Sequence, residues 1–101
     1  MTPVLPITAL GEGEMTACRV AGREFLVVNV EGSFYALANF CSHAGQRLSG
    51  GRLDGYRLHC PLHRAVFDVR TGAALAGPTR EALTRYPVLV EGGKVMVEVP
   101  T

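Results

Sequence analysis

Two short segments of this 101-residue chain carry side chains that bind transition metals. One residue separates Cys41 from His43, sixteen residues separate His43 from Cys60, and two residues separate Cys60 from His63. Thiolate and imidazole groups are the protein ligands of zinc ions and of some iron–sulfur clusters. The glycine-rich region 50–55 lies between the two segments and can fold the chain back, so that both segments reach one place. We therefore predict a single metal centre formed by these four side chains.

Two kinds of metal centre use two cysteines and two histidines: a tetrahedral zinc site and a [2Fe–2S] cluster with two nitrogen ligands. A zinc finger usually pairs like ligands, C-x-x-C followed by H-x-x-x-H, beside a helix. Here each segment supplies one thiolate and one imidazole, so each segment can reach both irons of a flat binuclear cluster. The mixed order favours the [2Fe–2S] cluster, and a zinc-stabilised interaction module is the alternative.

The elements that position these segments are predicted to be strands. Turn dipeptides such as Glu31-Gly32 and Gly92-Gly93 separate runs of β-branched and aromatic residues. The clearest predicted strands are residues 23–30, 33–40, 86–91 and 94–99. The only helical pattern, residues 79–86, is about two turns long and lies between two prolines. We predict an all-β fold of about ten short antiparallel strands forming a small sandwich or barrel, a single domain over residues 1–101 with its cluster-binding part at about 41–70.

Composition excludes several other classes of protein. Ten basic residues balance nine acidic ones without a long run of like charge, so neither nucleic acid nor an anionic membrane is an expected partner. No apolar run reaches the 18 residues of a membrane anchor, and the N-terminal sequence lacks the pattern of a signal peptide. Three cysteines cannot all pair, and two lie beside histidines, which favours metal binding in a reducing compartment. We expect a soluble cytoplasmic protein.

The two ligand motifs resemble those of a known family. CSHAG (41–45) and CPLHRAVFDVRTG (60–72) are similar to the C-x-H and C-P-x-H-G-x-x-F-D-x-x-T-G motifs of Rieske-type ferredoxins, with Arg64 where the family often has glycine. The resemblance implies a Rieske-like fold with a two-loop cluster-binding tip and one [2Fe–2S] cluster per chain. It also implies that Cys41 and Cys60 ligate one iron and that His43 and His63 ligate the other.

This resemblance implies a function as well. Rieske-type ferredoxins are the small electron carriers of bacterial multicomponent ring-hydroxylating oxygenases, and they are not themselves enzymes. The chain is then expected to be a monomer that accepts one electron from a flavin-containing ferredoxin reductase and passes it to a terminal oxygenase. Its outer iron, held by the two histidines, would be the exit. A small Rieske subunit of an assimilatory nitrite-type reductase is the alternative from another class.

Residues around the motifs predict a low reduction potential. Rieske centres span about −150 to +300 mV. The quinol-oxidising members resemble C-T-H-L-G-C and C-P-C-H-G-S-x-Y, with an inter-loop disulfide and with hydroxyl groups that donate hydrogen bonds to sulfur. This chain has Leu62 at the position of the disulfide cysteine, and Ala65 and Phe67 replace the two hydroxyl donors. We therefore predict a potential at the low end of the range.

Other residues near the motifs receive simpler interpretations. His59 is expected on the strand that enters the second loop, facing away from the metal, and Cys18 is expected to be a small buried hydrophobe. Phe34, Tyr35 and Phe40 are expected in the core. The resemblance also implies that the segment 76–79, which contains a proline, packs over the cluster.

The charge is unevenly distributed. Residues 41–70 contain five arginines and two aspartates, whereas residues 1–40 contain two arginines and four glutamates. A basic rim around the cluster would attract an acidic partner surface.

Overall fold

The computed structural model describes residues 1–41, 47–61, 64–77 and 80–99. Within these residues the all-β prediction is confirmed: the chain forms eleven strands in three antiparallel sheets and no α-helix, with two short 3-10 turns. The strands are β1 (Thr2–Pro6), β2 (Met15–Val20), β3 (Arg23–Val30), β4 (Ser33–Ala38), β5 (Arg52–Asp54), β6 (Arg57–His59), β7 (Val66–Asp68), β8 (Ala74–Ala76), β9 (Arg85–Tyr86), β10 (Val88–Glu91) and β11 (Lys94–Val97). The 3-10 turns are η1 (Ile7–Ala9) and η2 (Leu48–Gly50).

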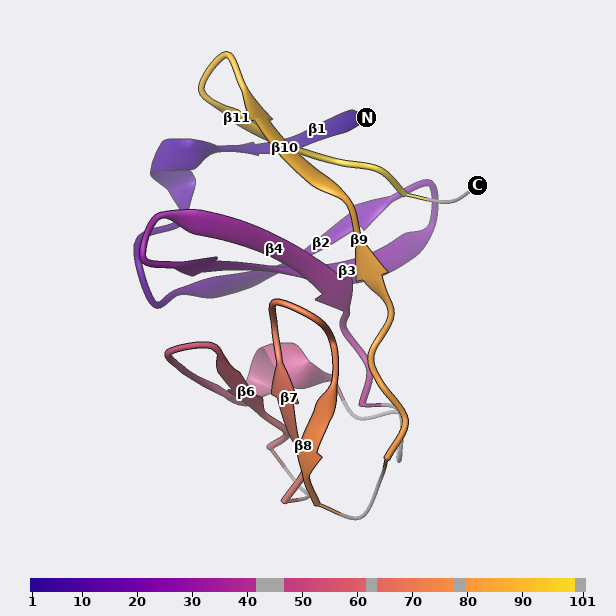
Figure 1. Ribbon diagram of the computed structural model, residues 1–101. Coiled ribbons are helices and arrows are strands. Elements are labelled where there is room, and N and C mark those ends of the chain that lie inside the picture. The colour runs from indigo at the N-terminus through magenta and orange to yellow at the C-terminus, as the bar shows by residue number, and fades with distance from the viewer. Residues whose placement is uncertain (42–46, 62–63, 78–79, 100–101) are drawn as a thin grey trace.

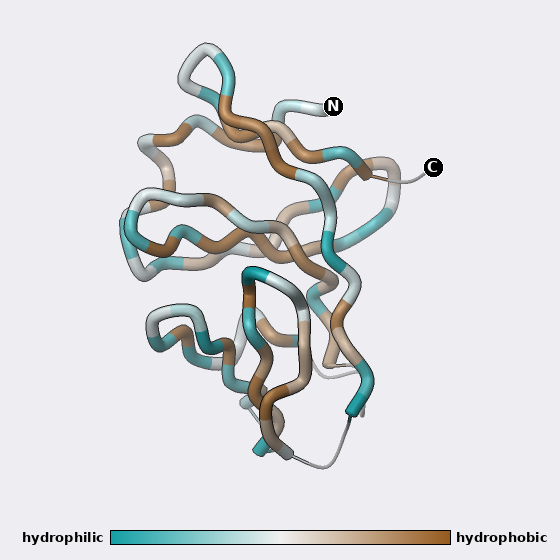
Figure 2. Tube along the Cα trace, viewed as in Figure 1, coloured by the Kyte–Doolittle hydropathy of each residue, from teal (hydrophilic) through white to brown (hydrophobic). Residues whose placement is uncertain are grey.

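The three sheets lie in layers (Figure 1). The sheet β2-β3-β4-β9 is in the middle, the sheet β1-β11-β10 lies on one side of it, and the sheet β5-β6-β7-β8 lies on the other. The hairpin of β5 and β6 is largely hydrophilic, in contrast to the apolar strands of the middle layer (Figure 2). No helix among the described residues has the length and apolar character needed to cross a membrane.

Strand β3 is buried on both faces from Phe25 onward, which explains the apolar run FLVV (25–28) in its sequence. Successive side chains of a strand point to opposite faces, so the strand contributes to two cores. Towards the β5–β8 sheet it supplies Leu26, Val28 and Val30. Towards β11 it supplies Phe25 and Val27, which share a core with the alternating residues Val95 and Val97. The half-buried alternation predicted for residues 94–99 is thereby confirmed for β11.

The weak helical pattern at residues 79–86 forms no helix in its described part, in agreement with the all-β prediction. In its described part, residues 80–84 are irregular and β9 follows directly. Backbone groups here bond across the fold: the Ala38 N–H donates to Thr84 O at 2.9 Å, and the Leu83 N–H donates to Gly72 O at 2.8 Å. Gly72 allows this approach, because a β-carbon at that position would lie 2.3 Å from Leu83 O. Long-range pairing therefore replaces the local helix.

The strand predicted over residues 86–91 is divided by Pro87. Strand β9 pairs with β4 in the middle sheet, whereas β10 pairs with β11 in the neighbouring sheet. Proline has no N–H group for a ladder, so the chain changes sheets at this residue.

Three of the four smaller expectations about buried residues hold. Phe34 and Tyr35 are partly buried against the two cores, and Cys18 packs against the core that contains β11, where burial raises the pKa of its thiol. Phe40 is not a core residue: it is 39% exposed, and the Arg47 guanidinium lies 5.3 Å from the centre of its ring.

Candidate metal centre

The two cysteines predicted as ligands lie in the same core. Cys41 follows the end of β4 and is 2% exposed, and Cys60 directly follows β6 and is 6% exposed. Both belong to the apolar cluster between the middle sheet and the β5–β8 sheet, and neither forms a disulfide. The other two predicted ligands, His43 and His63, lie outside the described residues.

The backbone around both ligand segments, residues 41–46 and 60–65, is tied together at its described ends. Phe40 and Arg47 form a β-bridge across the base of the first segment. The Cys60 N–H donates to Ala65 O at 3.0 Å and closes the second segment. A β-carbon at Gly77 would lie 2.5 Å from the Ala65 Cα, so the described start of segment 76–79 packs directly on the second segment. Pro78, expected to shield the cluster, is outside the described residues.

A buried asparagine anchors the base of the first ligand segment. Asn39 is fully buried, and its Nδ2 donates to Glu24 Oε2 at 2.7 Å and to Ser49 Oγ at 3.2 Å. Its Oδ1 accepts a hydrogen bond from the Ser49 N–H at 2.9 Å, and its backbone oxygen accepts one from the Leu48 N–H at 2.7 Å. These bonds hold the residues before and after the segment at a fixed separation.

Glu24 on β3 extends this anchor to an arginine beyond the segment. Its Oε2 accepts a hydrogen bond from Arg47 Nε at 2.9 Å, and its Oε1 accepts one from an Arg19 guanidinium nitrogen at 3.2 Å. The Arg47 hydrogen bond, followed by that from Asn39, lowers the pKa of the Glu24 carboxyl below its usual value. The sequence pattern did not reveal this network, because Glu24 and Asn39 are fifteen residues apart.

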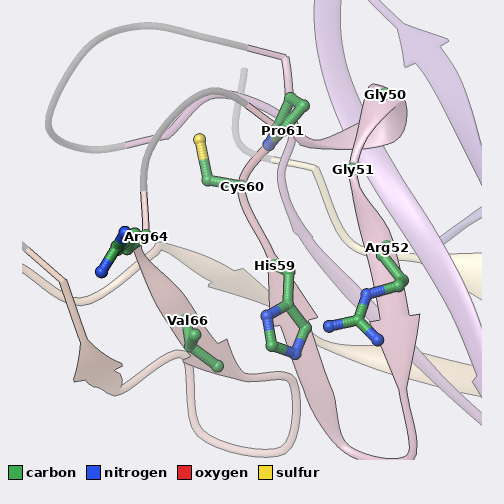
Figure 3. Close-up of a pocket in the computed structure, with 8 residues that line it drawn as sticks. All are labelled: Gly50, Gly51, Arg52, His59, Cys60, Pro61, Arg64 and Val66. Carbon is green, nitrogen blue, oxygen red and sulfur yellow. The ribbon is translucent and has the colours of Figure 1, made fainter.

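The environment of the two thiols fits an iron–sulfur cluster. The close-up shows the Cys60 sulfur pointing away from the His59 ring (Figure 3). Ala65 and Phe67, both fully buried in the same cluster, give the site an apolar wall. Two unpaired cysteines in one apolar core are what thiolate ligation of a cluster requires, and a bound iron would compensate the charge of the ligating sulfurs. The site therefore favours metal coordination over free thiols.

His59 occupies the position that the sequence predicted. It is the last residue of β6, and its ring lies between the side chains of Arg52 and Val66, opposite in direction to the Cys60 sulfur (Figure 3). Its Nε2 is shielded from solvent and has no hydrogen-bond partner among the described residues.

The all-β domain brings the two predicted thiol ligands into one core without a disulfide, as the predicted iron–sulfur protein requires. Comparison with protein families shows which one: the model described as the Rieske [2Fe–2S] domain matches residues 1–87. The chain belongs to this family, and its cofactor is a [2Fe–2S] cluster.

Comparison with individual relatives shows which kind of Rieske protein the chain is similar to. The chain is 42% identical to the ferredoxin component of the naphthalene 1,2-dioxygenase system of Pseudomonas aeruginosa, over 87% of this chain and 85% of that protein. It is 41% identical to the ferredoxin subunit of 3-phenylpropionate/cinnamic acid dioxygenase of Escherichia coli (strain K12), over 94% and 90%. Among solved structures, the ferredoxin of carbazole 1,9a-dioxygenase from Nocardioides aromaticivorans IC177 matches with a TM-score of 0.90 and 40% identity, covering 96% of this chain and 97% of that one.

These matches confirm the family inferred from the two ligand motifs. The chain is a Rieske ferredoxin of the type that serves ring-hydroxylating dioxygenase systems, and such components transfer electrons without catalysing the reaction themselves.

Proposed function

We propose that Cys41, His43, Cys60 and His63 hold one [2Fe–2S] cluster per chain, with the cysteines on one iron and the histidines on the other. The observation that carries this proposal is the burial of Cys41 and Cys60 in a single core cluster without a disulfide between them. The bound cluster would supply a centre that accepts and releases one electron. In this proposal residues 1–101 form a single domain, and residues of about 41–70 form its cluster-binding part.

The electron is proposed to come from a flavin-containing ferredoxin reductase and to leave through the histidine-bearing iron to a terminal oxygenase. Support comes from a related ferredoxin, 32% identical with a TM-score of 0.88, whose solved structure is a complex with the oxygenase in carbazole 1,9a-dioxygenase. A short-lived complex of this kind suits a monomeric cytoplasmic carrier.

A low potential fits the same assignment. Ala65 and Phe67 contribute no hydroxyl group to the core that contains both cysteines, so neither side chain can stabilise a reduced cluster through a hydrogen bond to sulfur. The nitrite-type reductase subunit and the zinc-stabilised module are not favoured, because the relatives are ferredoxins of dioxygenase systems and the family carries [2Fe–2S] clusters.

Metal analysis and electron paramagnetic resonance (EPR) test the ligand set. Protein isolated without oxygen should contain equal amounts of iron and acid-labile sulfide, and a colourless zinc protein would overturn the proposal. His43→Cys should move the g-values of the reduced protein towards those of an all-cysteine cluster. The matched control His59→Gln, one residue before Cys60, should leave them nearly unchanged. Unaltered g-values in His43→Cys would remove His43 from the ligand set.

A further inference from the structure

The outer face of the β5–β8 sheet carries two neighbouring rows of side chains with different charge. Leu53, Leu58 and Phe67 point inward from β5, β6 and β7, so the residues that alternate with them point outward. One outward row consists of Asp54, Arg57 and Asp68, which are cross-strand partners. The other consists of Arg52, His59 and Val66, also cross-strand partners and adjacent to the second ligand segment.

The first row is net acidic and the second is basic. Arg57 lies between two carboxylates, whereas the row of Arg52 and His59 contains no acidic residue. Arg64, four residues after the sulfur-bearing Cys60, adds a second guanidinium group beside this row (Figure 3).

These basic side chains line a hollow of about 600 Å³. Its wall includes Gly51, Arg52, His59, Cys60, Pro61 and Arg64. Within the part of the chain that the structure describes, three other arginines form ion pairs with carboxylates, namely Arg19, Arg47 and Arg70. Arg52 and Arg64, like Arg57, form no ion pair or hydrogen bond with any described residue, but Arg57 has Asp54 and Asp68 as cross-strand partners.

The backbone at the base of the hollow is closely packed. A β-carbon at Gly51 would lie 1.9 Å from the His59 backbone oxygen, so only glycine allows the two strands of the hairpin to approach this closely. The approach places Arg52 beside the His59 ring, whose Nε2 is shielded and unpartnered. Two planar guanidinium groups are suited to the oxygens of a carboxylate, which accepts several hydrogen bonds at once.

We propose that this hollow receives an aspartate or glutamate side chain from the surface of the terminal oxygenase, and that it fixes the position of the carrier on that partner. The inference rests on the proposed function. Cys60 and Pro61 belong to the wall of the hollow, so a carboxylate bound there places the partner surface next to the second ligand segment. Unpaired arginines in this position raise the rate of encounter with an acidic surface and select its orientation.

A direct binding experiment tests the hollow without an oxygenase. The probe is an acetylated, amidated tetraglutamate peptide, whose proton resonances should broaden when it binds near the paramagnetic reduced cluster. Broadening should fall at least about 3-fold in the double variant Arg52→Gln/Arg64→Gln. Arg57→Gln is the control: it removes one arginine from the same face one row away, against two in the double variant, and its effect should be small even per charge removed. Absent broadening in the wild type, or equal broadening in all three proteins, would overturn the proposal.

Electron transfer tests the function of the hollow. The acceptor is the terminal oxygenase of carbazole 1,9a-dioxygenase from Nocardioides aromaticivorans IC177, mixed with reduced carrier in a stopped-flow instrument. At low ionic strength the double variant should lower the second-order rate constant about 10-fold, and this difference should shrink with added salt. An equal loss per charge removed in Arg57→Gln would show that only net charge matters and would overturn the inference. Peptide binding without any electron transfer by the wild type would instead count against the proposed function and leave the carboxylate site standing.

Discussion

Replacing Asn39 with alanine should loosen the base of the first ligand segment. The side chain makes three hydrogen bonds, two to Ser49 and one to Glu24, and it is fully buried. Alanine retains the backbone bond from Leu48 but leaves the Ser49 N–H without its partner. Because this side chain joins the residues on either side of the segment, its loss should affect the cluster as well as the fold.

The magnitude follows from the bonds that are lost. A buried hydrogen bond contributes about 1 kcal/mol net to stability, so three bonds amount to about 3 kcal/mol. For a domain of this size a loss of 1 kcal/mol lowers the thermal midpoint by about 4–8 °C. We therefore expect the midpoint of Asn39→Ala to fall by about 15 °C, a large share of the stability of a small domain.

Asn29, which is also a buried asparagine, provides a matched control. It lies in β3, at the end of the strand opposite to Glu24. Its Nδ2 donates to Leu10 O and its Oδ1 accepts a bond from the Gly32 N–H, both at 2.9 Å. Asn29→Ala should lower the thermal midpoint by about 10 °C, from two bonds of about 1 kcal/mol each.

The assay compares cluster loss with unfolding. Both variants are incubated without oxygen in urea below the unfolding transition, and the decay of visible absorbance is followed beside the far-ultraviolet circular dichroism. Asn39→Ala should lose its absorbance before its secondary structure, whereas Asn29→Ala should lose both together. If the two variants release the cluster at the same rate, Asn39 does not position the ligand segment and our reasoning is wrong.

Three further predictions concern the core, the Tyr56 ring and acid stability. Ala65→Ser with Phe67→Tyr should raise the reduction potential by about 50–100 mV in voltammetry, since about 1–2 kcal/mol of added hydrogen bonding to sulfur corresponds to that shift; no shift would mean that these side chains do not face the cluster. Tyr56→Ala should lower the thermal midpoint by about 5–10 °C, because the Arg70 guanidinium lies 4.1 Å from the centre of the Tyr56 ring. Tyr56→Phe loses only the 3.5 Å bond to the Glu31 carboxylate and should melt like the wild type. Because the pKa of Glu24 is lowered in the folded protein, its contribution to stability is present above the usual pKa of 4.5 and is lost as the pH falls through the lower folded value. In Glu24→Gln the thermal midpoint should therefore depend less on pH between those two values. A pH dependence like that of the wild type would contradict this.

The sequence predicted those parts of the fold that depend on local spacing. The continuous apolar run of β3 and the alternation in β11 both report burial directly, because side-chain direction alternates along a strand. The cysteines Cys41 and Cys60 were identified from motif spacing, and the structure places them in one core. His43 and His63 rest on the motif alone and remain predictions.

What the sequence did not predict depends on contacts between distant residues. Residues 80–84 favour a helix locally, yet pairing with Ala38 and Gly72 gives them another conformation. Phe40 looks like a core aromatic, but Arg47 lies over it at the surface. The bond between Glu24 and Asn39 joins residues fifteen positions apart, and no periodicity marks such a pair. The common cause is tertiary pairing, which overrides local preference.

The two faces of the β5–β8 sheet serve different requirements of an electron carrier. The inner face, with Leu58 and Phe67, belongs to the core that contains both cysteines, so substitutions there act on the potential and on cluster retention. The outer face carries Arg52 in the hollow, where it has no partner within the described chain, so a substitution there acts on the encounter with another protein. A single exposed ion pair contributes little, which suits a complex that must dissociate after each electron. Because the two sets of side chains point to opposite faces, the effects of an inner and an outer substitution should add, with the potential following the first and the salt-dependent rate following the second.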